Sequence, residues 1–321
     1  MTRIAVAALF AVGVALLALA AAPSLWAPRE PYAMTRAPAS PEAFRTVSPY
    51  GASGADVETL EFVARGVDAP LANAVVATGS DGRPAPLAWR NRVTEPVFFP
   101  DLDPADEAQI LAAIKAHAPG DAVILAWWDF SRRIRAFAER RAPLDDAEAS
   151  GLLIPTAWDA DSTRIAATQR QFWGADVPER EGRTFQKFID ALLLDEAGGA
   201  RLLSELAQGR DAFVALRLSD IWRASAARPG ALSLGYKDFP AAGDPHGAMK
   251  AVREWMAREG VEGGYAVELR GATARVHYLS RGRDAQTLLA KLLPFSSSNP
   301  LALERLRLVH QFKDYWIYEL K

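Results

Sequence analysis

DAVILAWWDF, residues 121–130, is the stretch of sequence that decides how we interpret the fold. Its first half, Val123–Leu125, has the continuous apolar character of a buried strand. The strand leads directly to Trp127, Trp128 and Asp129. Open α/β sheets bind ligands in the crevice beyond the carboxyl ends of their strands, so this stretch favours an α/β fold with a recognition site here. A simpler interpretation has one Trp in the core, the other over a loop, and Asp129 as the cap of the next helix.

Helices are expected on both sides of this strand. Asp103 is a suitable N-cap residue and Pro104 fits the first helical position, with apolar residues following at helical spacing until Pro119-Gly120. After the strand, residues 130–141 place their apolar side chains on one helical face and their arginines on the others. The order helix, strand, helix is typical of an α/β unit.

The rest of the chain continues to alternate between strand and helix patterns. A second buried strand lies within GRDAFVALRLSDIWR (209–223), and it too ends in an acid and a tryptophan, Asp220 and Trp222. We therefore predict an α/β protein with a mixed, mainly parallel sheet flanked by helices and an N-terminal membrane helix. The other expected elements are a strand or short helix at 57–64 and 71–78, a turn-rich segment at 79–92, helices at 161–173, 182–207, 247–259 and 284–293, a loop at 235–240, strands at 263–270 and 272–280, and a hairpin of 306–312 with 315–320.

The N-terminus carries an apolar stretch, Ile4–Pro23, with Arg3 before it. About 20 apolar residues are enough to span the hydrocarbon core of a bilayer as a helix. The small residues Ala18–Ala22 also fit the cleavage region of a secretory signal, but the length favours an uncleaved signal-anchor. We therefore divide the chain into a signal-anchor or signal peptide (1–25), a Pro-rich tether (26–50) and a single exported α/β domain (51–321).

The composition excludes several classes of function. The 321 residues carry a formal net charge of −2, so there is no electrostatic footprint for nucleic acid. Cysteine is absent, which excludes disulfides, thiolate nucleophiles, iron–sulfur clusters and haem attached through C-x-x-C-H. The four histidines are too far apart in sequence to suggest a metal site, and the nucleotide-binding, G-x-S-x-G and H-E-x-x-H motifs are missing. We predict no cofactor, no metal and no catalytic residue.

The candidate binding residues follow from the two strand ends. If the two buried strands are parallel, the acids that end them meet at one edge of the sheet. An indole supplies a large apolar face with one N–H donor, and a carboxylate accepts hydrogen bonds from a peptide N–H or a hydroxyl. A histidine in GDPHG opens a helix, where it is suited to hold an anion. The predicted binding set is Trp127, Trp128, Asp129, Arg133, Asp220, Trp222 and His246.

The trio at 127–129 resembles the W-W-D motif of oligosaccharyltransferase catalytic subunits. In that family the motif lies at a strand end of the soluble domain and reads the hydroxyl of the acceptor sequon. The resemblance covers about 20 residues, from Val123 through the expected helix that contains Arg133 and Ile134. Those enzymes need many membrane helices with metal-holding carboxylates, whereas this chain has a single hydrophobic segment. The resemblance therefore implies a shared domain or recognition pocket, and not glycosyl transfer.

A second resemblance covers roughly residues 120–321. The N-terminal apolar segment, AWWDFSRRI, LSDIWR, LGYKDFPAAGDPHG and the ending LVHQFKDYWIYEL are similar to the hydroxylamine oxidation protein HaoB family. This family is found beside hydroxylamine oxidoreductase in ammonia-oxidising and methane-oxidising bacteria. The resemblance implies an accessory role in periplasmic hydroxylamine metabolism, with no established chemistry and with a multi-haem hydroxylamine oxidoreductase as the partner. The apolar segment adds the expectation of a single-pass inner-membrane protein with its main domain in the periplasm.

Three functions remain open at this point. The first is a non-catalytic accessory protein of the HaoB type, held in the inner membrane by residues 4–23. The second is a peptide- or glycan-binding module that resembles the oligosaccharyltransferase soluble domain. The third is a hydrolase or lyase that uses Asp129 with His246, which requires the two groups to lie within hydrogen-bond reach directly or through one water.

Overall fold

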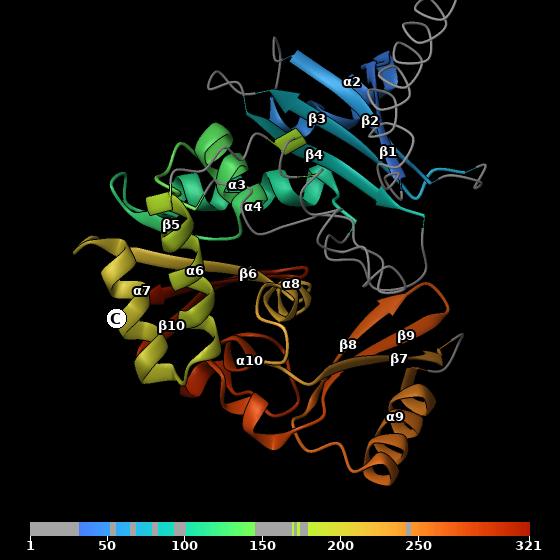
Figure 1. Cartoon of the computed structure of the whole chain (residues 1–321), viewed down its shortest axis with the longest axis vertical. Coiled ribbons are helices and arrows are strands. Elements are labelled where there is room, and N and C mark those ends of the chain that lie inside the picture. The colour runs from blue at the N-terminus through green and yellow to red at the C-terminus, as the bar shows by residue number, and fades with distance from the viewer. Residues whose placement is uncertain are drawn as a thin grey trace, which may run out of the picture.

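A computed structural model describes residues 32–51, 56–64, 69–78, 83–92, 101–144, 169, 172–173, 179–241 and 245–321. Within these ranges the chain forms three β-sheets with helices packed between and around them (Figure 1). The strands are β1 (Tyr32–Pro38), β2 (Asp56–Ala64), β3 (Ala72–Thr78), β4 (Pro84–Asn91), β5 (Val123–Leu125), β6 (Ala212–Arg217), β7 (Leu234–Pro240), β8 (Tyr265–Arg270), β9 (Thr273–Leu279), β10 (Leu306–Phe312) and β11 (Tyr315–Leu320).

The helices have one to four turns. The α-helices are α2 (Pro41–Val47), α3 (Pro104–His117), α4 (Trp128–Arg133), α6 (Glu179–Leu193), α7 (Glu196–Ala207), α8 (Asp220–Ala227), α9 (Pro245–Glu259) and α10 (Leu288–Leu292). Short 3-10 helices are η1 (Ser48–Tyr50), η5 (Gly282–Gln286) and η6 (Pro300–Ala302), and η2 (Ile134–Ala138) is a π-helical turn that continues α4.

The central sheet has the strand order β10-β11-β6-β5. Successive residues of β6 point to opposite faces, so Val214 and Leu216 join one core cluster while Phe213 and Ala215 join the other. The first face is covered by α6, α7 and α10, and the second by α3 and η2. This arrangement explains the continuous apolar run of β6, because a strand buried on both faces needs no polar side.

Two antiparallel sheets flank the central one. Strands β1 to β4 form a meander, and α3 and α4 lie between it and the central sheet (Figure 1). Strands β7, β9 and β8 form a three-stranded sheet, with α9 against one face through Trp255 and Met256. This second sheet reaches the rest of the protein through its other face, next to α8 (Figure 1).

Several predictions of local structure are confirmed. Strands β2, β3, β8 and β9 and the closing hairpin β10–β11 lie where the sequence indicated. Helix α3 begins after Asp103, whose carboxylate accepts from the backbone N–H groups of Ala105 and Asp106, with Pro104 at the first position. The predicted helix at 182–207 is two helices, because Asp195 interrupts the pattern and caps α7.

The prediction of a mainly parallel sheet is wrong. Only β5 and β6 are parallel among the described strands, and every other pair is antiparallel. The segment 235–240, expected as a loop, is β7, and the turn-rich segment 79–92 contains β4. A buried strand has the same apolar pattern in either direction, and the second neighbour of β6 is β11, about a hundred residues later in the sequence.

The N-terminal predictions are only partly within the described residues. Residues 4–23, predicted to form a membrane helix, lie outside them, as does the expected helix at 161–173 except for three of its positions. In the part of the chain that the structure describes, no helix is long and apolar enough to cross a membrane. Residues 32–50 of the predicted tether form β1, α2 and η1, since the stretch 32–37 has no proline and pairs with β2.

A pair of adjacent glycines tests the close contact of α6, α7 and α10. A Cβ added at Gly199 would lie 2.5 Å from the Ala191 carbonyl oxygen and 2.6 Å from Leu288 Cδ2, whereas at Gly198 the nearest atom is Asp195 Oδ1 at 3.1 Å. We expect Gly199→Ala to lower the free energy of unfolding by about 1–3 kcal/mol, because backbone must move. Gly198→Ala, the matched control, should change it by less than about 1 kcal/mol in urea titrations. Equal effects would contradict the packing described.

Candidate functional site

The Trp-Trp-Asp trio follows β5 and opens α4. Trp127 occupies the N-cap position with an extended backbone (φ −62°, ψ 151°), and Trp128 and Asp129 lie in the first turn. Their relative exposures are 1%, 0% and 1%. The strand end is therefore closed over by the protein itself, and the trio does not line an open crevice in this structure.

Both indoles are packed on all sides. Trp127 meets the ring of Phe185 edge-on at a centroid distance of 5.2 Å, and the Arg223 guanidinium lies 4.5 Å from its ring centroid. Trp128 lies 5.5 Å from the ring of Trp173, and Arg132 stacks on it at 4.7 Å. Such arginine–indole contacts contribute more in a desolvated setting than at a surface. Both tryptophans are thus core residues, whereas the simpler interpretation places one of them over a loop. Its other part is wrong, because Trp127 and not Asp129 occupies the N-cap of α4.

Asp129 is held by two arginines from different helices. Its Oδ2 accepts from Arg133 Nη2 at 2.9 Å, and its Oδ1 accepts from Arg223 Nη2. Burial alone would raise the pKa of Asp129, but the charges of Arg223 and Arg133, and their hydrogen bonds, lower it below its usual value. Asp129 is therefore a buried carboxylate that stays ionised.

The network continues from Arg133 to α3. Arg133 is fully buried, donates through Nε to Glu107 Oε1 and through Nη1 to the Pro86 carbonyl oxygen at 3.0 Å. The other oxygen of Glu107 accepts from the Tyr50 hydroxyl at 3.3 Å. Burial raises the pKa of Glu107, although Arg133 and Arg217 oppose this. One guanidinium thus joins α4, α3 and β4.

On the other side the network reaches Asp220, at the start of α8. Asp220 Oδ2 accepts from the Arg217 backbone N–H at 2.8 Å, and Oδ1 lies 3.3 Å from Arg223 Nη1. Burial raises the pKa of Asp220 to about 6, although the charge of Arg223 and the Arg217 N–H oppose this, and the charge of Asp129 adds to it. The Arg217 side chain itself binds Asp314 at 2.6 Å.

The structure brings some of the predicted binding residues together and separates others. Since β5 and β6 are parallel neighbours, the acids that follow them do meet, sharing Arg223. Trp222 does not join them, because its indole N–H donates to His277 Nδ1 at 2.9 Å on the other side of α8. His246 begins α9, but its side chain lies outside the described residues, so the Asp129–His246 pair stays a prediction.

The chemistry of this cluster is that of a structural ion network. Both oxygens of Asp129 and of Glu107 accept hydrogen bonds from the chain's own side chains. Among the described residues, no group of three or more His, Cys, Asp or Glu side chains could hold a metal ion. A recognition role for the trio would require this region to open, and it stays a prediction.

Sequence reasoning missed a groove at the end of α3, on the face of the central sheet that this helix covers. It has a volume of about 310 Å³ and lies between the last turns of α3 and strands β10 and β11. Val309, at an irregularity in the β10–β11 register, borders it and is 42% exposed. The apolar floor of the groove is formed by Ile114, Ile124, Phe213 and Ile317. The polar side chains at its rim are those of His117, Asp211, Arg307, His310 and Glu319.

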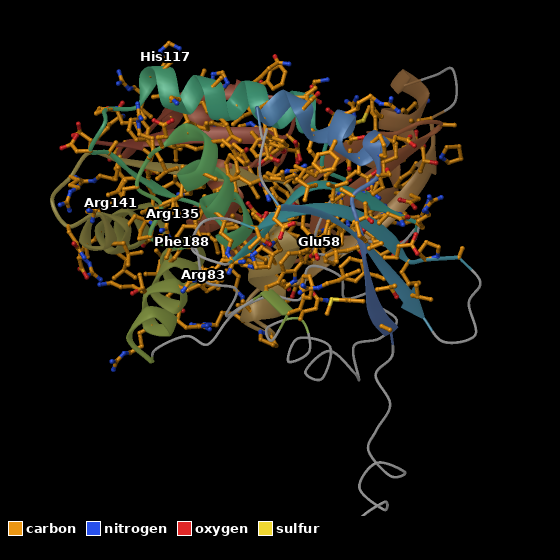
Figure 2. The ribbon with its side chains drawn as sticks, turned by 90° about the horizontal axis from the view of Figure 1, so that it is seen from above. Glu58, Arg83, His117, Arg135, Arg141 and Phe188 are labelled. Atoms are coloured by element: carbon orange, nitrogen blue, oxygen red, sulfur yellow. The ribbon has the colours of Figure 1, made fainter. Side chains whose placement is uncertain are left out.

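The rim of the groove carries both signs of charge. Arg307 donates to Glu319 Oε2 through Nε at 3.0 Å and also through Nη2. Figure 2 shows His117 at the outer surface of α3. No single motif could reveal the groove, because its residues come from segments nearly two hundred positions apart.

The whole chain, residues 1–320, matches the family described as HaoA-associated protein HaoB. This protein belongs to that family. No curated protein matches it. Among solved structures it is similar to the C-terminal globular domain of the oligosaccharyltransferase from Archaeoglobus fulgidus, with 14% identity, a TM-score of 0.32, and coverage of 67% of this chain and 97% of that one. The C-terminal domain of PglB from C. jejuni gives 12% identity, a TM-score of 0.39 and coverage of 67% and 99%.

These domains are of the class that the W-W-D motif resembles. At such identities and TM-scores they assign no function to this HaoB-family chain.

Removing the central carboxylate should be costly. Asp129→Ala leaves Arg133 and Arg223 buried without their shared partner, so we expect the free energy of unfolding to fall by about 3–5 kcal/mol. Asp190→Ala is the matched control, because it breaks an exposed pair with Arg228 and should cost less than about 1 kcal/mol. Urea unfolding monitored by circular dichroism measures both. A loss at Asp129 as small as at Asp190 would show that the network is not structural.

The raised pKa of Asp220 predicts an unusual pH dependence. The folded-state pKa of about 6 lies above the unfolded value of about 3.9, so the folded state binds more protons between these values. The stability that Asp220 contributes is therefore present below about pH 4 and lost as the pH rises through 6. Relative to Asp220→Asn, the unmodified protein should lose on the order of 2–3 kcal/mol over this range, as measured by urea unfolding at each pH. A constant difference would contradict the raised pKa.

Proposed function

We propose that this HaoB-family chain is a non-catalytic accessory protein that binds HaoA, the multi-haem hydroxylamine oxidoreductase, at the periplasmic face of the inner membrane. The observation that carries the proposal is the family match over residues 1–320, whose description is association with HaoA. The apolar segment 4–23 supports attachment to the membrane, with the main domain exported.

The buried network supports a non-catalytic role. Its acids would be the natural candidates for general acid–base work, yet Asp129 and Glu107 are occupied by guanidiniums and removed from solvent. Groups arranged in this way hold elements together. They do not present a proton or a lone pair to a substrate.

The groove between α3 and β10 is the surface that we propose for the contact with HaoA. Its apolar floor can take one large apolar side chain, and its rim offers hydrogen-bonding and charged groups of both signs. Protein interfaces combine an apolar centre of this kind with a polar rim. The exposed Val309 enlarges the apolar area at its edge.

The proposal is tested by the affinity of the full-length protein, in mild detergent, for purified HaoA. Val309→Glu places a charge at the edge of the apolar floor, and we expect it to weaken binding about tenfold or more. Leu269→Glu is the matched control, since Leu269 is 66% exposed on β8 and does not line the groove. Isothermal titration calorimetry gives the dissociation constants.

Unchanged affinity in Val309→Glu would remove the groove from the proposal. Absence of any binding by the unmodified protein would remove the association itself. The alternative of a peptide- or glycan-binding module rests on the trio at 127–129, whose indoles are buried, and tryptophan fluorescence titration with such ligands is its test.

A further inference from the structure

The contact between α8 and the β7-β9-β8 sheet includes one hydrogen-bonded histidine, beside the edge-on contact of the Trp222 and Tyr236 rings. His277 of β9 is 4% exposed and uses both ring nitrogens. Nδ1 receives the Trp222 indole N–H at 2.9 Å, and Nε2 lies 3.2 Å from Glu268 Oε2. The rings of Trp222 and His277 also meet edge-on, with their centroids 5.9 Å apart.

These two contacts determine the protonation state of the ring. An indole N–H can only donate, so Nδ1 must be an unprotonated acceptor. A carboxylate can only accept, so the ring proton lies on Nε2 and is donated to Glu268. The contact as built therefore requires neutral His277 in a single tautomer.

The charged side chains around His277 form ion pairs with one another. From β8, Glu268 is also bound by Arg270 Nη2 at 3.0 Å. Arg275, two residues before His277, makes two hydrogen bonds of 2.7 Å to Asp238 of β7. Tyr236 on β7 lies opposite His277 in the register. From η5, Asp284 is bound by Arg281, and α9 packs on the opposite face of the sheet through Trp255.

We propose that His277 is a proton-sensitive latch between α8 and the β7-β9-β8 sheet. When Nδ1 takes up a proton from solvent, the acceptor of the Trp222 indole becomes a donor. Two N–H groups then face each other across 2.9 Å, and Trp222 must move away. Glu268 keeps its hydrogen bond and gains an opposite charge, so the charged ring stays on the sheet while α8 is released. The exposed part of Glu268 gives the proton access from solvent.

The latch is tested on the full-length protein with 15N-labelled histidine and tryptophan, by nuclear magnetic resonance between about pH 8 and about pH 5, where histidines titrate. We expect His277 to carry its proton on Nε2 at the upper limit. As Nδ1 gains a proton, the Trp222 indole resonance should shift and hydrogen exchange in β7 and β9 should rise about tenfold. His310 serves as an internal reference, since it lies on β10 opposite Ile317 of β11, away from α8, and a proton added to its ring should leave the Trp222 resonance unchanged.

Two variants separate the latch from other titrations, including that of Asp220 on α8. His277→Asn keeps an acceptor oxygen near the Nδ1 position but cannot titrate, so the Trp222 resonance should become independent of pH. Trp222→Phe removes the donor, so the acid-dependent rise in exchange should vanish even if His277→Asn fails to fold. A proton on Nδ1 at about pH 8, an acid response that persists in either variant, or an unmoved Trp222 resonance as His277 titrates would each overturn the proposal.

Discussion

The interaction on which the rest of the structure depends is the sharing of Asp129 by Arg133 and Arg223. Once this carboxylate is buried as an anion, the cost of its desolvation is offset only if both guanidiniums are in place. Arg133 is in turn bound to Glu107 and to the backbone of β4, and Arg223 comes from α8. Four elements from distant parts of the chain are therefore fixed relative to one another by a single charge.

This arrangement gives the W-W-D trio a structural role in the core, beside which its recognition role stays a prediction. The end of a parallel strand is where α/β sheets commonly place a ligand. Here the chain supplies its own cations, Arg133 and Arg223, to that position. Trp127 stacks on Arg223, and Trp128 stacks on the neighbouring Arg132. The partner of the family is then expected to meet an outer surface, and the groove beside β10 supplies one with an apolar floor.

The sequence allowed local structure and the identity of the central residues to be predicted, but not their environment. Periodicity and capping residues located α3, β2, β3 and the final hairpin, because these signals lie within a few residues of each other. The direction of strand pairing and the partner of Asp129 depend on residues far away: Arg223 is 94 positions later. The sequence around an acid does not show whether its carboxylate is free to bind a ligand or is paired with an arginine from a distant segment.

The two connections of α8 respond to protons in opposite ways. Toward the core, α8 contributes Arg223 and Asp220 to a network of charged groups. In this network the pKa of Asp129 is lowered by the two arginines. Burial raises the pKa of Asp220, so protonation of Asp220 relieves a desolvation cost. Toward the β7-β9-β8 sheet, α8 contributes a donor-only indole that needs a neutral imidazole. Protonation of His277 therefore breaks a contact on the sheet side of α8, whereas protonation of Asp220 on the core side removes a buried charge. The two responses thus lie on opposite sides of a single helix, while the pKa of Asp129, lowered by Arg223 and Arg133, keeps the centre of the core network ionised in mild acid.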